Sequence, residues 1–291
     1  MQTASVLTPR RAAAEWVWPA LAGSLLLLAF WPTLVELVSE WIERPEYGHG
    51  FLMPPVAAWL LWLNRGQLRR AEQKPSLAGA LLLVPCMLLL LLGEMKLSWF
   101  LKPYAFVASV GCLIWALYGK AVLRICLPSL LVLLLMCPLP GRVQRDLTLP
   151  LKRTAALFAT GLLDVTGIHA TLEGNLIHLP GLESLWVADA CSGIRSLISL
   201  ASLAVVAAVF WPAPWPVRAV VVASSVPVAV LVNGLRLWLT GFLSVHVSPE
   251  AARGFFHLAE GFGMFAFAAV LLATWAWLLA LLVRPAEGGK A

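Results

Sequence analysis

The stretch LAGALLLVPCMLLLLL at residues 77–92 contains no charged and no amide side chain. As an α-helix it would be about 24 Å long, close to the roughly 30 Å of hydrocarbon that a membrane span crosses. A backbone in lipid must satisfy its own hydrogen bonds, and this run lacks the strict alternation of a barrel strand. We therefore expect a membrane-spanning helix here.

Similar apolar runs extend along the chain in both directions from this one. We place spans near residues 18–37, 50–63, 77–92, 99–118, 121–139, 192–211, 217–242 and 255–283. The composition agrees, since 60% of the 291 residues are hydrophobic, 12% are charged and the mean hydropathy is +0.85. About a quarter of the residues of a soluble domain are charged. The sequence predicts one all-α polytopic membrane domain over residues 1–291 with about eight transmembrane helices.

The positions of the basic residues predict the orientation of these spans. The ends and loops assigned to the cytoplasm carry Arg10, Arg11, Arg65, Arg69, Arg70, Lys74, Arg218, Arg284 and Lys290. Lysine and arginine in short loops mark the cytoplasmic side, so both termini are expected there. Four further cations, Arg142, Arg145, Lys152 and Arg153, then lie outside, within a long segment where this rule is weaker. The net charge of +6 comes mainly from helix ends rather than from a basic patch with aromatics, so no nucleic-acid partner is expected.

Residues 141–190 form the main polar segment and are expected to be extracytoplasmic, directly before the sixth span. A short helix at the membrane interface is expected over 154–165, and a small hairpin over 170–179 with its turn at Glu-Gly-Asn. His169 and His178 lack the spacing and the carboxylate companions of a metal site. With no phosphate-binding glycine loop either, no metal and no cofactor is predicted.

Cys191, in ADACSGIR at 188–195, is the candidate reactive residue, because it alone of five cysteines has polar neighbours. The predicted topology brings Arg236 and His257 to the same outer depth. An arginine inside an apolar span is costly and usually marks function. Backbone N–H groups at a helix start and a nearby cation such as Arg195 favour the thiolate. The three residues predict a nucleophile, an oxyanion partner and a proton carrier, the requirements of cysteine-based acyl chemistry.

Three further residues are candidates for supporting roles. Asn233 precedes Arg236 by three positions and therefore shares its helical face. Glu260 follows His257 by three and can orient the imidazole from the same cleft. His49 stands at the outer mouth of the second span and is a candidate for lining that cleft.

Four short motifs carry a resemblance to a known family. ACSGIRSL at 190–197, NGLR at 233–236 and GFFHLAEG at 254–261 follow YGHGFL at 47–52. In this order they resemble the exosortase and archaeosortase family of membrane transpeptidases. The resemblance implies that Cys191 is the nucleophile, that Arg236 is the family's arginine and that His257 is the third member. The archaeal branch has an arginine at the third place, so the histidine indicates the bacterial branch.

The resemblance also implies a substrate, a compartment and a reaction. The expected partners are membrane-anchored secreted proteins whose C-terminal sorting tail carries a Pro-Glu-Pro motif, a transmembrane helix and a basic end. The enzyme would lie in the bacterial inner membrane with its active site facing the periplasm. It would cleave the tail through a thioester, which an acceptor amine or water then resolves, giving transfer for export or surface attachment, or simple proteolysis.

Two other classes remain open on the sequence alone. A polytopic transporter would use Arg236 and His257 as a substrate or proton site near the midplane. A non-catalytic factor in envelope polysaccharide export would need none of the three residues. Neither alternative requires the thiol of Cys191, so loss of that thiol separates both from the enzyme.

Overall fold

The structure, a computed structural model, describes residues 9–95, 99–174, 176–182, 185–186, 193–248, 250 and 263–282. The described residues are mostly helical and form two compact units, each of which is considered by itself. Unit 1 contains residues up to 44 together with 48–139, and unit 2 contains residues 45–47 and those from 140 onwards.

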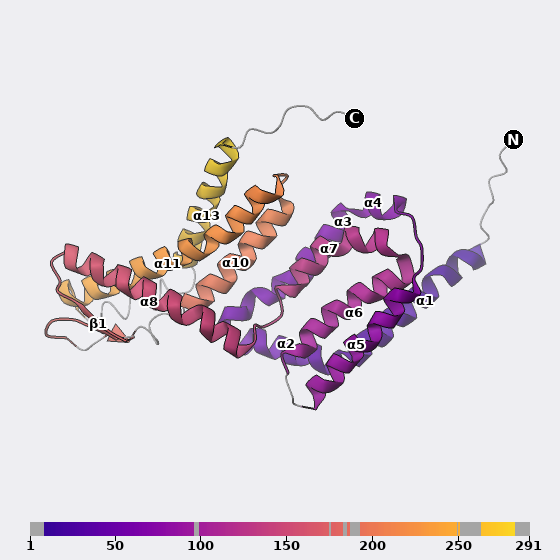
Figure 1. Cartoon of the computed structure of the whole chain (residues 1–291), viewed down its shortest axis with the longest axis horizontal. Coiled ribbons are helices and arrows are strands. Elements are labelled where there is room, and N and C mark those ends of the chain that lie inside the picture. The colour runs from indigo at the N-terminus through magenta and orange to yellow at the C-terminus, as the bar shows by residue number, and fades with distance from the viewer. Residues whose placement is uncertain are drawn as a thin grey trace. The chain divides into compact units, whose positions relative to one another are not determined.

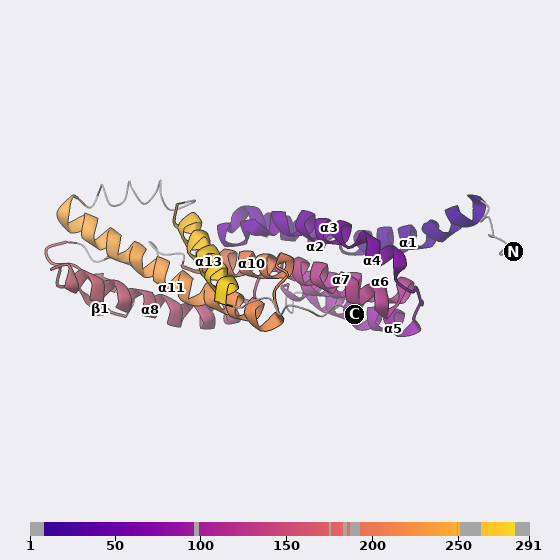
Figure 2. The same ribbon diagram turned by 90° about the horizontal axis from the view of Figure 1, so that it is seen from above.

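Unit 1 is a helical bundle in two layers. Its elements are α1 (Pro9–Ala29), α2 (Trp31–Glu43), the 3₁₀ helix η1 (Pro45–Leu52, which begins in unit 2), α3 (Met53–Leu63), α4 (Arg65–Arg70), α5 (Leu77–Glu94), α6 (Leu101–Tyr118) and α7 (Lys120–Leu134). Figure 2 shows α1, α2 and α3 on one side of α5, α6 and α7. Helix α5 packs along α6, and α7 contacts both α6 and α3.

The expected first span, near 18–37, is not one continuous helix. It bends by 59° between residues 17–29 and α2. Pro32 stands in the first turn of α2, and because it has no N–H it cannot continue the hydrogen-bond ladder of α1. Phe30 at the break is fully buried and its ring meets Phe106 of α6 edge-on. The bend is therefore fixed by packing as well as by the proline.

A buried lysine joins three helices of unit 1. The Lys102 Nζ on α6 lies 2.6 Å from Glu36 Oε2 on α2 and 3.1 Å from Glu94 Oε1 at the end of α5. Lys102 is only 3% exposed, whereas both carboxylates are about half exposed. A Cβ at Gly93 would overlap the lysine stem, so glycine at that position makes room for it. The two charge pairs offset the cost of burying the ammonium group.

The described part of unit 2 consists of a small sheet and the helices α8, α10, α11 and α13 (Figure 1). Its elements are α8 (Gly141–Val165), β1 (Thr171–Glu173), β2 (Leu176–His178), β3 (Leu185–Trp186), α10 (Gly193–Phe210), α11 (Trp215–His246) and α13 (Gly263–Leu282). The strands are antiparallel in the order β1-β2-β3, with Leu172 opposite Ile177 and Ile177 opposite Leu185. The chain turns between β1 and β2 at Gly174, whose φ is +60°.

Helix α8 is twice as long as the short helix expected over 154–165. It begins at Gly141, so the four cations from Arg142 to Arg153 lie on a helix rather than in an irregular segment. The helix start predicted from the sequence, residue 154, is too late because Pro150 and the charged residues interrupt the apolar pattern. In the structure Ala155, Ala159 and Leu163 are fully buried, and α8 packs along α11. Burial of this small-residue face stabilises the longer helix.

The chain is a multi-pass membrane protein by the length and hydropathy of its helices. Within the described residues, four helices are long and apolar enough to span a membrane: α5, α6, α11 and α13. The bent pair of α1 and α2 would make a fifth if it crosses as one span. Helices α3 and α7 have 11 and 15 residues, shorter than the spans expected near 50–63 and 121–139. The count of eight spans stays a prediction.

Two apolar clusters lie on different faces of α11 and hold unit 2 together. One cluster joins α8, the sheet and α11 through Ala155, Leu163, Ile177 and Leu237. The other joins α10, α11 and α13 through Leu200, Ala204, Val221, Ala229, Val232, Ala268 and Leu272. Helix α11 is thus the central element of this unit, with neighbours on both sides.

Candidate active site

Arg236 is a buried cation on the central helix of unit 2. It is 6% exposed and lies in the second half of α11, a candidate membrane span. Ala229, Val232 and Arg236 recur at helical spacing. Since Ala229 and Val232 pack against α10 and α13, Arg236 continues the face of α11 that meets those helices. A buried arginine in an apolar helix is a functional-site candidate by its energetic cost alone.

The glycine of the Asn-Gly-Leu-Arg motif sets how closely α8 approaches this part of α11. A Cβ added to Gly234 would lie 3.1 Å from the carbonyl oxygen of Ala155 and 2.5 Å from Cδ1 of Phe158. Two turns further on, a Cβ at Gly241 would lie 3.1 Å from the side chain of Leu163. Small residues at such crossings let helix backbones approach closely. The motif thus carries a packing function beside the arginine.

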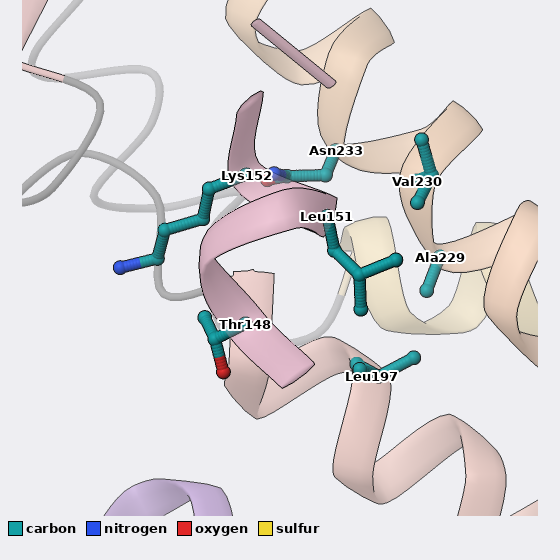
Figure 3. A pocket seen from close by; sticks show the side chains of 7 residues that line it. All are labelled: Thr148, Leu151, Lys152, Leu197, Ala229, Val230 and Asn233. Atoms are coloured by element: carbon teal, nitrogen blue, oxygen red, sulfur yellow. The ribbon is translucent and has the colours of Figure 1, made fainter. Parts of the chain in front are cut away.

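Asn233 lies where α8, α10 and α11 meet. Its side chain is 7% exposed and lines a small cavity of about 10 Å³, bounded by Thr148, Leu151, Lys152, Leu197, Ala229, Val230 and Asn233. Figure 3 shows Asn233 directed toward α8, while the ammonium end of Lys152 extends away from the cavity. A cavity of this size holds about one water molecule, for which a buried amide is a suitable partner. The cavity is too small for a substrate side chain.

The helices beside α11 begin close to the depth of Arg236. Helix α10 lies near Asn233 at Leu197, and its first residue, Gly193, is about 6 Å further along the helix. Because α10 runs antiparallel to α11, that first turn extends in the same direction as Arg236. On α13, Trp275 Nε1 donates a hydrogen bond to Ser224 Oγ of α11 at 2.9 Å.

The hydrogen bond from Trp275 gives the register of α13 against α11. Gly263 lies twelve residues before Trp275, and Arg236 lies twelve residues after Ser224. Each interval is about 18 Å of helix, so the first turn of α13 is near the level of Arg236. Met264, in that turn, packs against the cluster that contains Val232. The described start of α13 and the buried arginine therefore lie in one region of unit 2.

Several predicted site residues lie outside the described residues. Cys191 comes two positions before the described start of α10, and His257 comes six positions before the start of α13. Glu260 also lies outside the described part of the chain. Arg195 belongs to the first turn of α10, but its side chain is not described. Their roles, and those of Arg236 and Asn233 in a reaction, stay predictions.

His49 belongs to unit 1, whereas Arg236 belongs to unit 2. In η1 its Nε2–H donates a hydrogen bond to the carbonyl oxygen of Leu135 at 3.1 Å. The neighbouring Gly50 leaves space for the indole of Trp41, whose Nε1 donates to the carbonyl oxygen of Met136 at 3.0 Å. His49 and Gly50 of the Tyr-Gly-His-Gly-Phe-Leu segment, within η1, therefore contribute to packing beside the residues that follow α7. The part of His49 in a shared cleft stays a prediction.

The fold and this site define a polytopic membrane protein with a buried arginine on α11, about one turn beyond the junction of α8, α10 and α11 at Asn233. A family model described as transmembrane exosortase (Exosortase_EpsH) matches residues 41–274, which is most of the chain. The chain belongs to the transmembrane exosortase family. No match to a curated protein or to a solved structure was found.

Proposed function

We propose that this protein is a cysteine-dependent membrane transpeptidase that removes the C-terminal sorting tail of membrane-anchored secreted proteins. Family membership supports a membrane transpeptidase role. The observation that carries the proposal is Arg236, buried in an apolar helix at the level where α10 and α13 begin. The sequence positions of Cys191 and His257, just ahead of those two helices, are consistent with a single site.

In the proposed reaction the thiolate of Cys191 attacks the scissile carbonyl carbon. The guanidinium of Arg236 donates hydrogen bonds to the oxyanion that develops, a contribution of about 3 kcal/mol per good donor in acyl-transfer enzymes. As the C–N bond breaks, the imidazolium of His257 gives its proton to the leaving amine, and a thioester to Cys191 remains. An acceptor amine or water then attacks the thioester, His257 takes up its proton, and the thiolate is restored.

The substrate and the compartment are part of the same proposal. The tail would contain a Pro-Glu-Pro motif, a transmembrane helix and a basic end, and the site would face the periplasm of the bacterial inner membrane. The helix of the tail would lie among the apolar helices of the enzyme. This arrangement accounts for a catalytic site within a multi-pass protein, because the peptide bond to be cleaved is anchored at the membrane surface.

Co-expression with a tagged reporter that carries such a tail tests the proposal. We expect processing by the wild type, an uncleaved precursor with Cys191→Ala, and strongly reduced processing with His257→Ala. Arg236→Lys keeps the charge but loses the planar donor pair, so we expect processing between those of the wild type and Arg236→Ala. Unchanged processing by Cys191→Ala would refute the nucleophile assignment and favour a transporter or a non-catalytic export factor.

A further inference from the structure

A second, larger cavity of unit 2 lies away from Arg236, between α8 and the small sheet. It is an open groove of about 600 Å³, lined by Leu149, Pro150, Arg153, Leu157, Leu172 and Gly174. This volume is typical of ligand-binding sites, whereas the cavity beside Asn233 holds about one water molecule. The proposed reaction does not use any of the six lining residues.

The groove is on the side of α8 that helix packing leaves uncovered. Ala155 and Ala159 are fully buried on the face that meets α11. With about 100° between successive residues, Arg153 and Leu157 lie roughly half a turn around the helix from that face. Leu149 and Leu157 are 53% and 54% exposed. The same helix therefore supports α11 on one face and offers an apolar wall on the other.

The charge of the groove favours an acidic ligand. Among the described residues that line the groove, Arg153 is the only one with an ionisable side chain, and it is exposed. Among the residues that the structure describes, no carboxylate lies within ion-pair distance of Arg153. Helix α8 as a whole has four basic residues against the two acidic residues Asp146 and Asp164. An arginine beside apolar walls suits a carboxylate flanked by apolar groups.

The other wall of the groove is an edge strand. In the sheet order β1-β2-β3, strand β1 pairs with β2 alone among the described strands. Alternate residues of an edge strand direct their N–H and C=O groups away from the sheet, where an extended peptide can pair with them. The three residues of β1 extend for about 10 Å, the length of a three-residue peptide segment. Leu172, the central residue, lines the groove itself.

We propose that this groove binds an extended peptide segment, with its backbone added to the edge of β1 and a carboxylate side chain paired with Arg153. That the peptide is part of the protein substrate rests on the proposed function. A lipid headgroup would supply an anion for Arg153 but no backbone for β1. The strand edge therefore favours the peptide over the membrane surface.

A binding measurement on the full-length Cys191→Ala protein tests the proposal without turnover. The protein is placed in nanodiscs of neutral lipid, and fluorescence anisotropy follows a short labelled peptide with one Glu between apolar residues, and its Gln twin. We expect Arg153→Gln to weaken binding of the Glu peptide about fivefold, the upper range for an exposed ion pair, and to leave the Gln peptide unchanged. Arg145→Gln, which removes the same charge from α8 outside the groove, should change neither affinity by more than about twofold.

Backbone pairing has its own test. N-methylation of one alternate set of peptide nitrogens should weaken binding, and N-methylation of the other set should leave the affinity unchanged. Only one of the two sets of N–H groups faces β1. Equal affinities for the Glu and Gln peptides, or equal effects of Arg153→Gln and Arg145→Gln, would overturn the proposal. An Arg153 effect that appears only as binding to vesicles of anionic lipid would instead assign the groove to a headgroup.

The two proposals can fail separately. If the wild type does not process the reporter while the Glu peptide still binds through Arg153, the transpeptidase function is refuted and the peptide site stands. If Cys191-dependent processing is observed but peptide binding ignores Arg153 and N-methylation, the enzyme stands and the groove proposal is refuted.

Discussion

A single added methyl group at Gly234 should disturb the helix crossing beside Arg236. In Gly234→Ala the new Cβ meets Phe158 Cδ1 at 2.5 Å and the Ala155 carbonyl oxygen at 3.1 Å. The phenyl ring can move, since Phe158 is partly exposed, but the carbonyl belongs to the backbone of α8. Overpacking of this kind costs about 2 kcal/mol, and the helix propensity of alanine returns up to about 1 kcal/mol. The net loss in the free energy of unfolding is then about 1 kcal/mol.

Gly161→Ala is the matched control, because Gly161 lies on α8 with nothing within 4 Å of its added Cβ. This variant gains the propensity without the clash and should be more stable by about 0.5–1 kcal/mol. The difference between the two substitutions therefore isolates the clash at about 2 kcal/mol. Steric trapping in bicelles measures the free energy of unfolding of both variants in a membrane-like setting.

Phe158→Ala combined with Gly234→Ala tests which contact is responsible. Removing the ring relieves the shorter contact, so a favourable coupling of about 1 kcal/mol is expected between the two substitutions. If Gly234→Ala and Gly161→Ala change stability alike, and no coupling appears, then α8 does not approach α11 closely at Gly234 and the reasoning is wrong.

Two further predictions concern unit 1. Lys102→Met should destabilise the protein by about 2 kcal/mol, because it leaves Glu36 and Glu94 together without their cation. Adding Glu36→Gln and Glu94→Gln should restore most of that loss. An equal loss of stability in the triple variant would contradict the charge pairing. Gly119 has φ +88°, and its added Cβ would overlap the Lys74 carbonyl oxygen, so Gly119→Ala should cost about 2–3 kcal/mol in the same unfolding assay. A neutral Gly119→Ala would contradict this close approach of Lys74 to the turn between α6 and α7.

Helices whose signal is continuous hydropathy were predicted well from the sequence. The runs near 77–92 and 99–118 correspond to α5 and α6 within two residues at each end. The prediction failed where a proline or a charge changes the meaning of the pattern. The break after Ala29 depends on Pro32, and the first half of α8 continues a helix whose second half packs against α11. Neither effect is visible in an average over neighbouring residues.

The candidate site, like the fold, could be predicted from the sequence only in part. The cost of an arginine in an apolar run singles out Arg236 from the order of residues alone, and its burial agrees with that expectation. The packing of Gly234 against Ala155 had no signal, because the two residues are far apart in sequence. The sequence contains no indication of the groove at Arg153 either, because in it Arg153 is only one of the basic residues that predict membrane orientation. Its neighbour Leu172 comes from another element, β1.

The order of amino acids is enough to establish a multi-pass helical membrane protein with the motifs of the transmembrane exosortase family. Transfer of consecutive side chains from water to lipid is a local property, and for that reason it can be predicted residue by residue. Tertiary packing sets where α2 bends away from α1, which face of α8 meets α11 and which face lines the groove. Those outcomes depend on the fit between side chains distant in sequence, and packing without voids or overlaps has no counterpart in hydropathy.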